Sequence, residues 1–342
     1  MPDRAPALEA VDLEVHYPIH SGRSAGKTVR ALEATSLALH AGRIVALVGE
    51  SGSGKTTLAR ALAMAQRPTG GSVRLGGEEV SVRGRRGRRE YASRVQLVLQ
   101  DPFGSLNPLH RVRYLLERPL KLHGEVTGAA DLDQQLRGLL ERVRLTPVEQ
   151  FIDKYPHELS GGQRQRVAIA RALAVRPDVL LGDELVSMLD VSMRLEVLNL
   201  LGALRTEQSL AMLYITHDIA GARYFADEIS VMYAGEMVEF GSTEAVTQNA
   251  AHPYTQLLLE SSPDPDRMEF LSAVTESAPE TEKDYGEPPN LIDPPAGCRF
   301  HPRCPFAMEK CSTQAPPKFQ LADEDGHWMR CWLAEPKEEK NA

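Results

Sequence analysis

Eight residues near the start of the chain, GESGSGKT at 49–56, have the residue types and spacing of a phosphate-binding loop. Small residues let consecutive backbone N–H groups turn inward around a phosphate, and a following helix directs its positive end at the same place. The Lys55 ammonium can reach the outer phosphates of a nucleotide, and the Thr56 hydroxyl can coordinate Mg²⁺. We therefore expect nucleotide binding by Gly49, Glu50, Ser51, Gly52, Ser53, Gly54, Lys55, Thr56 and Thr57.

An acid pair supplies the second half of such a site. VLLGDE at 179–184 is a short apolar run that ends in Asp183 and Glu184. We expect Asp183 to hold the Mg²⁺ shell and Glu184 to polarise the attacking water. The next apolar run ends in ITHD, where the His217 imidazole could hydrogen-bond the γ-phosphate. These residues predict hydrolysis of a nucleoside triphosphate.

A second anion site is predicted at LSGGQRQR, residues 159–166. A Ser-Gly-Gly turn that opens a helix presents free backbone N–H groups to an anion. One nucleotide does not need two such sites from one chain, whereas a head-to-tail dimer does. We therefore expect the nucleotide bound by a partner subunit to be contacted by Ser160, Gly161, Gly162 and Gln163.

The elements that must position these residues alternate between strands and helices. Residues 43–65 read as strand, loop and helix, and 179–184 and 210–218 read as buried parallel strands. Further predicted elements are strands at 8–17 and 34–43, a mostly helical region at 108–158 with a clear helix at 132–145, and a helix within 162–178 that Pro177 ends. The basic run at 81–90 is predicted to be a solvated hairpin or loop, with contact to anionic lipid or nucleic acid as the alternative.

Composition limits the class of protein. The chain has 342 residues, of which 42% are hydrophobic and 25% charged, as in soluble globular proteins. A net charge of −8 argues against nucleic acid as the main partner. No apolar run approaches the roughly 18 residues of a membrane span, and the first residues lack the apolar core of a secretory signal. A cytosolic protein is expected, in which clustered cysteines favour metal binding over disulfides.

With these motifs in place, the sequence resembles the ATP-binding cassette (ABC) family, whose signature is LSGGQ. The family's other motifs follow in its order, with Gln100 in the Q-loop and Asp190 of SMLD (187–190) in the D-loop. The resemblance implies an α/β nucleotide-binding domain of the P-loop NTPase, RecA-like class, with an antiparallel β subdomain and a helical subdomain at about 101–175. The resemblance also gives Gln100 two roles. Gln100 would be a third Mg²⁺ ligand beside Thr56 and Asp183, and a third catalytic residue beside Glu184 and His217. Tyr17 matches the aromatic that stacks on adenine, or is a plain strand aromatic.

Three later segments resemble the oligopeptide/dipeptide importer branch: MYAGEMVEFGSTEAV (232–246), HPYTQLLLESSPDP (252–265) and PPAGCRFHPRCPFAMEKC (294–311). The resemblance implies the ATP-hydrolysing subunit of a peptide importer, on the cytoplasmic face of the inner membrane. Its partners would be two permease subunits, an extracytoplasmic solute-binding protein and a second ABC ATPase, with no nucleic acid. LVSMLD (185–190) departs from the usual Pro-Thr-Ser-Ala-Leu-Asp, which leaves open an oligosaccharide importer or a non-hydrolysing partner. A soluble ABC ATPase acting on nucleic acid or ribosomes is the alternative from another class.

The last part of the chain carries all four cysteines. We expect an ATPase domain at 1–262, followed at 263–342 by a linker, Pro- and Glu-rich at 276–290, and a small Cys-rich regulatory or metal-binding extension. The cysteine spacing lacks the tight pairs of a structural zinc site, while iron–sulfur clusters accept looser spacing. The resemblance points to a [4Fe–4S] cluster on Cys298, Cys304, Cys311 and Cys331; zinc, free thiols or a disulfide are the alternatives.

Overall fold

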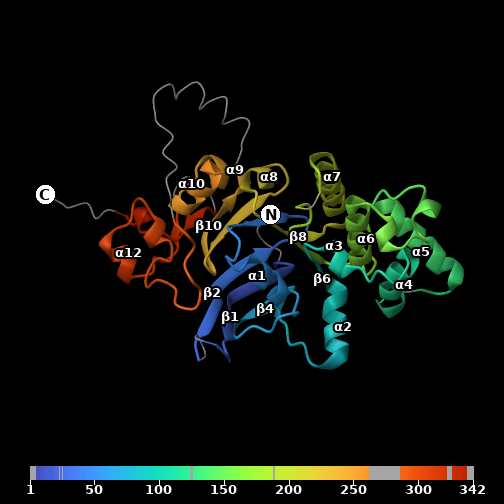
Figure 1. The fold of residues 1–342 in the computed structure, drawn as a ribbon, viewed down its shortest axis with the longest axis horizontal. Coiled ribbons are helices and arrows are strands. Elements are labelled where there is room, and N and C mark those ends of the chain that lie inside the picture. The colour runs from blue at the N-terminus through green and yellow to red at the C-terminus, as the bar shows by residue number, and fades with distance from the viewer. Residues whose placement is uncertain are drawn as a thin grey trace, which may run out of the picture.

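The computed structural model describes residues 5–22, 24, 26–123, 126–187, 189–261, 286–321 and 326–336. Within these ranges the strands form two sheets. A four-stranded antiparallel sheet has the order β2-β1-β4-β5, and an eight-stranded mixed sheet has the order β11-β12-β10-β9-β3-β8-β7-β6. Helix α1 packs against strands of both sheets (Figure 1). No helix in the described ranges is long and apolar enough to cross a membrane.

The strands have the following bounds: β1 Leu8–Pro18, β2 Thr28–Leu39, β3 Ile44–Val48, β4 Gly70–Leu75, β5 Glu78–Glu79, β6 Val95–Val98, β7 Val179–Asp183, β8 Ala211–Thr216, β9 Glu228–Tyr233, β10 Glu236–Ser242, β11 Phe319–Gln320 and β12 Trp328–Met329. The helices are α1 Lys55–Leu62, α2 Gly84–Arg94, α3 Pro102–Ser105, α4 Val112–His123, α5 Ala129–Arg142, α6 Gly161–Leu173, α7 Val191–Gln208, α8 Ile219–Arg223, α9 Thr243–Gln248, α10 Pro253–Glu260 and α12 Glu309–Thr313. Short 3-10 turns lie at Val148–Gln150, Pro156–Glu158, His301–Arg303 and Trp332–Ala334.

The parallel strands β9, β3, β8, β7 and β6 form the centre of the large sheet. Alternate residues of β3 enter two different hydrophobic cores. Ile44, Ala46 and Val48 pack with the helical side of the molecule, whereas Val45 and Leu47 pack with α1 and β1. A strand covered on both faces must be apolar at every position, which explains the unbroken apolar runs in the sequence.

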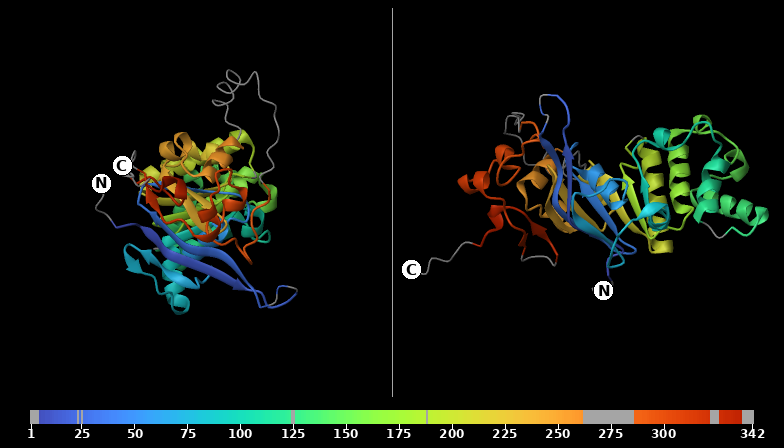
Figure 2. Two further views of the ribbon diagram at one scale, coloured as in Figure 1. Left: turned by 90° about the vertical axis from the view of Figure 1, so that its left-hand side faces the viewer. Right: turned by 90° about the horizontal axis from the view of Figure 1, so that it is seen from below.

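Helices α3 to α6 pack on one another and lie at the end of the molecule opposite α12 (Figures 1 and 2). The helix predicted at 132–145 is present as α5, although Arg144 already has a left-handed φ of 56°. The helix predicted within 162–178 is α6, which ends at Leu173, before the Arg-Pro pair at 176–177.

The interpretation of the basic run at 81–90 as a hairpin or loop was wrong, because residues 84–94 form α2. Arginine and glutamate are good helix formers, and a single buried side chain fixes the helix. Tyr91 is buried, and its hydroxyl donates a hydrogen bond to the Leu62 carbonyl at the end of α1. The arginines are thereby left on the solvent side.

The C-terminal tail, defined here as residues 286–321 and 326–336, extends the large sheet. Its strand β12 pairs antiparallel with β10, and β11 pairs with β12. Figure 1 shows the tail beside β10 and α10. The tail therefore packs directly on the large sheet. Of the predicted linker at 276–290, residues 276–285 lie outside the described ranges.

A buried polar cluster joins the tail to the sheet and to α10. The Glu239 carboxylate on β10 is fully buried and accepts hydrogen bonds from the backbone N–H groups of Ala251 and His252. The Nε2 atom of His327, in the tail, lies 2.9 Å from Glu239 Oε1. The His252 Nδ1 atom accepts the Tyr254 N–H and so caps α10. Burial lowers the pKa of His252 to about 4, with Glu239 opposing the shift.

The buried His252 predicts a loss of stability in mild acid. Its pKa is lower in the folded chain than the unfolded value of 6.5, so only the unfolded chain takes up the proton between these values. Stability from this group is complete above about pH 6.5 and falls by about 3 kcal/mol towards pH 4. A His252→Asn variant keeps a capping acceptor without the titration. The free energy of unfolding, measured by denaturant at pH 7 and 4.5, should fall less in the variant, and equal falls would contradict this account.

Candidate nucleotide-binding and hydrolysis site

The loop at 49–56, called the phosphate loop below, joins β3 to α1 through backbone conformations that require glycine. Gly54 precedes α1 with a left-handed φ of 110°, and a Cβ there would lie 2.6 Å from the Ala31 carbonyl oxygen. A Cβ on Gly49 would lie only 2.2 Å from the Met232 carbonyl oxygen. The loop is thus wedged against β2 and β9, which fixes its curvature.

Lys55 is held inside this curvature. Its Nζ atom donates hydrogen bonds to the carbonyl oxygens of Gly49 and Glu50, both at 2.7 Å, and to Ser53 Oγ at 3.3 Å. Burial lowers the pKa of Lys55, and the nearby carboxylates of Glu184, Asp183 and Glu50 oppose the shift. The Lys55 ammonium is therefore a buried charge that its acidic neighbours stabilise against the cost of burial.

Asp183 ends β7 and lies beside the start of α1. It is buried, and burial raises its pKa, while a hydrogen bond with the Thr56 side chain acts in the opposite direction. Among the residues that the structure describes, no group of three or more His, Cys, Asp or Glu side chains could hold a metal ion. Mg²⁺ that is bound together with a nucleotide usually takes only one or two protein ligands. The neighbouring oxygens of Thr56 and Asp183 fit that kind of site.

Glu184 lies between the two other predicted catalytic residues. The Gln100 Nε2 atom donates to Glu184 Oε2 at 2.5 Å, and His217 Nδ1 is 3.7 Å from Glu184 Oε1. Glu184 has a left-handed φ of 49°, and its backbone N–H donates to the Ile215 carbonyl of β8. The structure thus brings Gln100, Glu184 and His217 together at the carboxyl ends of adjacent parallel strands.

The predicted trans-acting residues lie at the start of α6. The Ser160 hydroxyl accepts the Gln163 N–H, and the Gln163 side chain accepts the Ser160 N–H, so the two form a reciprocal capping box. Ser160, Gly162 and Gln163 line a cavity of about 430 Å³ together with residues of α7. These residues belong to the helical side of the molecule, and Ser160 is exposed there.

The described residues of the unusual segment LVSMLD make core and helix-capping contacts. Leu185 is buried, and its side chain packs so closely on Gly182 that a Cβ there would lie 2.4 Å from Leu185 Cδ1. The Asp190 carboxylate accepts the Met193 N–H and so caps α7. Met188 lies outside the described residues. Leu185 therefore fills core space where the family's proline would stand, and both acids of the pair precede it unchanged.

Tyr17 lies near the end of β1, paired with Val29, and packs partly against the apolar core of α1 and β1. Both of its predicted roles remain predictions. Two other residues, Tyr254 and Arg303, contact the phosphate loop, and the sequence did not predict these contacts. The Glu50 N–H donates to the Tyr254 hydroxyl at 2.8 Å, and Arg303 donates to both carboxylate oxygens of Glu50. The only signal in the sequence was that each residue lies in a segment that resembles the importer branch, Tyr254 in 252–265 and Arg303 in 294–311.

The four cysteines occupy one region of the tail. None forms a disulfide; Cys311 and Cys331 are buried, and Cys298 and Cys304 are half-buried. Burial, with smaller contributions from the other three cysteines, raises the pKa of Cys298 to about 12. Backbone N–H groups of Phe300, Phe306 and Leu333 hydrogen-bond the sulfurs two residues before them. Within the described part of the tail, no three of these side chains are placed so that they could hold one metal ion.

The contact at Gly49 predicts that this glycine is indispensable. In a Gly49→Ala variant the new methyl group collides with a backbone oxygen that cannot move aside, and we expect a loss of about 2–3 kcal/mol of stability. Gly52→Ala is the matched control, because Gly52 has a φ of 78° but open space around it. Only the backbone strain of about 1 kcal/mol should remain there. Denaturant midpoints measure both, and equal losses would contradict the role of the collision.

Comparisons with known proteins agree with this geometry. A family model described as "ABC transporter" matches residues 32–187. A second, described as "Oligopeptide/dipeptide transporter, C-terminal region", matches residues 238–311. The chain is 39% identical to the dipeptide transport ATP-binding protein DppF of Escherichia coli K12, over 97% of this chain and 96% of that protein. It is 37% identical to the oligopeptide transport ATP-binding protein AppF of Bacillus subtilis 168, over 95% and 97%.

Solved structures show the same fold. A dimeric, post-hydrolysis state of the ATP-binding cassette MJ0796 with ADP and Pi has a TM-score of 0.62 and 27% identity, covering 69% of this chain and 98% of that one. CbiO1 of Clostridium perfringens, from the transporter complex CbiONQ, has a TM-score of 0.63 at 23% identity, covering 79% and 99%. The predicted nucleotide-binding fold is confirmed. The chain belongs to the ABC transporter ATP-binding proteins, and within them to those that carry the oligopeptide/dipeptide transporter C-terminal region.

Proposed function

We propose that this chain is the ATP-hydrolysing subunit that energises an ABC importer of dipeptides or oligopeptides. The observation that carries the proposal is the arrangement of Lys55, Asp183 and Glu184 at one edge of the parallel sheet, with Gln100 and His217 against the Glu184 carboxylate. The relatives named as dipeptide and oligopeptide transport proteins, similar over nearly the whole chain, support the peptide substrate.

The residues divide the work of hydrolysis between binding and water activation. Backbone N–H groups of the phosphate loop and the Lys55 ammonium would bind the β and γ phosphates. Thr56 and Asp183, with Gln100, would hold Mg²⁺, which neutralises phosphate charge when bound. Gln100 and His217 face the two oxygens of Glu184 and orient this carboxylate, so that it can accept a proton from the attacking water. His217 could also donate to the γ-phosphate.

The partners follow from the same assignment. A second ABC ATPase would face the phosphate loop with its own signature residues, while Ser160 to Gln163 of this chain would face the partner's nucleotide. Exposed apolar side chains just after the Q-loop, Leu109 at 80% and Tyr114 at 43% exposure, suit contact with a permease subunit. The proposed location is the cytoplasmic face of the inner membrane, with an extracytoplasmic binding protein supplying the solute. The proposed ATPase domain comprises residues 1–262, with 101–175 as its helical part, and 263–342 form the extension.

Replacement of the general base tests the mechanism in the assembled transporter. Addition of the binding protein loaded with a dipeptide or oligopeptide should stimulate ATP hydrolysis. A Glu184→Gln subunit should still bind ATP but lower turnover at least ~100-fold at this site, the usual weight of general-base assistance. ATP turnover and nucleotide binding are measured on the same preparation.

Two outcomes would contradict the proposal. Near-normal turnover in the Glu184→Gln transporter, with the partner's site inactivated, would remove the catalytic role. Stimulation by an oligosaccharide-loaded binding protein and none by peptides would replace the substrate class. An Asp178→Asn subunit is the control, because Asp178 pairs with Arg94 at the opposite edge of the sheet.

We further propose that the four cysteines hold a [4Fe–4S] cluster. Four thiols in one region, with backbone N–H groups directed at their sulfurs, suit a site of thiolate ligands. A single zinc ion holds its sulfurs at about 2.3 Å and so draws them together, whereas four iron atoms spread the ligands over a larger volume. The spacing of the four cysteines, with five, six and nineteen residues between them, lacks the tight pairs of a structural zinc site and so favours the cluster.

Metal content tests the cysteine assignment. Protein purified without oxygen should be brown and contain about four irons per chain, one for each thiolate of a [4Fe–4S] cluster. A Cys331→Ser variant should lose colour and iron together. Colourless protein with stoichiometric zinc, or with neither metal, would refute the cluster.

A further inference from the structure

The C-terminal tail reaches the phosphate loop directly. The Arg303 guanidinium donates from Nη1 to Glu50 Oε2 at 2.8 Å and from Nη2 to Glu50 Oε1 at 2.9 Å. Only 9% of the Arg303 side chain is exposed, and Arg303 also donates to the Tyr233 hydroxyl. Two parallel bonds between a guanidinium and a carboxylate are the strong form of this interaction. The hydrogen bond that Arg303 donates to Glu50 is the largest influence that raises the pKa of Arg303 above its already high value.

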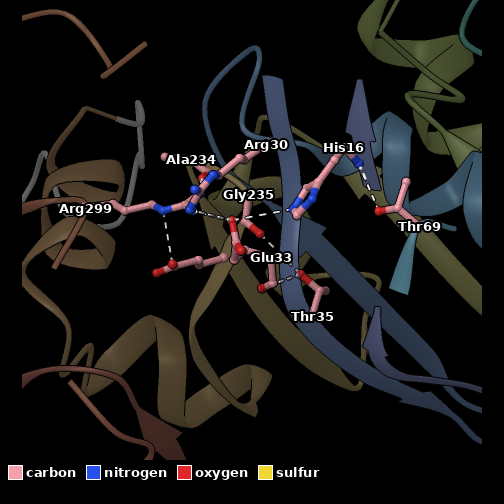
Figure 3. Close-up of polar contacts among 9 residues, drawn as sticks. His16, Arg30, Glu33, Thr35, Thr69, Ala234, Gly235 and Arg299 are labelled. Carbon is pink, nitrogen blue, oxygen red and sulfur yellow. Dashed lines mark hydrogen bonds and ion pairs between the residues drawn. The ribbon is translucent and has the colours of Figure 1, made fainter. Parts of the chain in front are cut away.

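A second tail arginine holds the turn that supports the same loop (Figure 3). Arg299 is buried and donates to Glu33 Oε2 of β2 at 2.9 Å and to the Ala234 carbonyl. Its Nε atom lies 3.0 Å from Glu236 Oε1. Ala234 and Gly235 form the turn between β9 and β10, and the Gly235 N–H donates to the Ser53 carbonyl oxygen at 2.8 Å. Arg299 therefore reaches the phosphate loop through one intervening turn.

The segment before the tail adds a third support. The Tyr254 hydroxyl accepts the Glu50 N–H, and Tyr254 is fully buried against Tyr233 and Phe300. Glu50 is thus held by its backbone through α10 and by its carboxylate through the tail. Its own carbonyl oxygen accepts from Lys55. The position of the Lys55 ammonium depends on Glu50, and the position of Glu50 depends on residues more than two hundred positions later in the chain.

We propose that Arg303 is a positioning residue of the nucleotide site, which neutralises and orients Glu50 so that the phosphate loop accepts a polyanion. The inference rests on the proposed function of residues 49–56 as the phosphate loop. The Glu50 carboxylate lies close enough to Lys55 to act on its charge. Without a cation beside it, this carboxylate would repel nucleotide phosphates. Arg303 cancels that charge, and the tail becomes a part of the ATP site rather than an appendage to it.

Charge neutralisation makes a different prediction from simple bracing of the fold. If Arg303 acts by compensating Glu50, then removal of the Glu50 charge should restore ATP binding in a chain that lacks Arg303. If Arg303 only braces the tail, the second substitution should restore nothing and should lower stability further. The two roles therefore separate in the double variant.

The experiment measures Mg-ATP binding to the full-length chain by calorimetry, with the thermal midpoint of each variant recorded alongside. Arg303→Met should raise the dissociation constant about tenfold, the effect of losing one charge-assisted bidentate pair. Arg303→Lys keeps the charge without the paired geometry, so its dissociation constant should lie between those of the wild type and Arg303→Met. The double variant Arg303→Met with Glu50→Gln should return to within about threefold of the wild-type value.

Lys310→Met is the matched control. Lys310 is also a tail cation with an acidic partner, Glu335, and lies over the Trp332 ring, so its contacts stay within the tail. Its dissociation constant should remain within about twofold of wild type, since an exposed pair contributes little. Equal ATP binding by wild type and Arg303→Met would overturn the inference while leaving the nucleotide site intact. A persistent defect in the double variant would overturn it in favour of bracing, and a wild-type chain that does not bind ATP would overturn the proposed function itself.

Discussion

The buried ammonium of Lys55 is the charge around which the site is organised. Three carboxylates, Asp183, Glu184 and Glu50, lie near enough to favour its protonated form against the cost of burial. Each carboxylate has a further partner: Asp183 bonds Thr56, Glu184 bonds Gln100, and Glu50 bonds Arg303. A buried charge is stable only when its neighbours are themselves satisfied. Each of these pairs therefore contributes to the electrostatic surroundings of Lys55.

Sequence patterns predicted the parts of the site that are local in the chain. Strand, loop and helix at 43–65 follow from an apolar run, glycines and a helix-forming segment, and they appear as β3, the phosphate loop and α1. The acid pair and His217 lie at the ends of buried strands, whose parallel arrangement brings them to one edge of the sheet. Local sequence is sufficient to predict them because each functional residue lies at the end of the element that positions it, or directly beside that end.

The contacts that the sequence did not predict join distant residues or depend on a single anchor. Arg303 and Glu50 are 253 positions apart, and nothing in the pattern of either segment names the other. The helix α2 was missed because its polar residues carry no apolar periodicity, and one buried tyrosine fixes it. The left-handed backbone of Glu184 was also not foreseen, since glycine or asparagine is the usual residue in that conformation.

The attachment of the tail explains why its arginines can act with precision. A tail joined only by a linker would place Arg303 loosely, and two hydrogen bonds near 2.9 Å could not then be kept. Here β12 pairs with β10, and the fully buried Glu239 bonds both His327 of the tail and the backbone that begins α10. Pairing also covers an exposed edge of the sheet. Because α10 carries Tyr254 to the Glu50 backbone and the tail carries Arg303 to the Glu50 carboxylate, Glu239 links the two segments that hold Glu50.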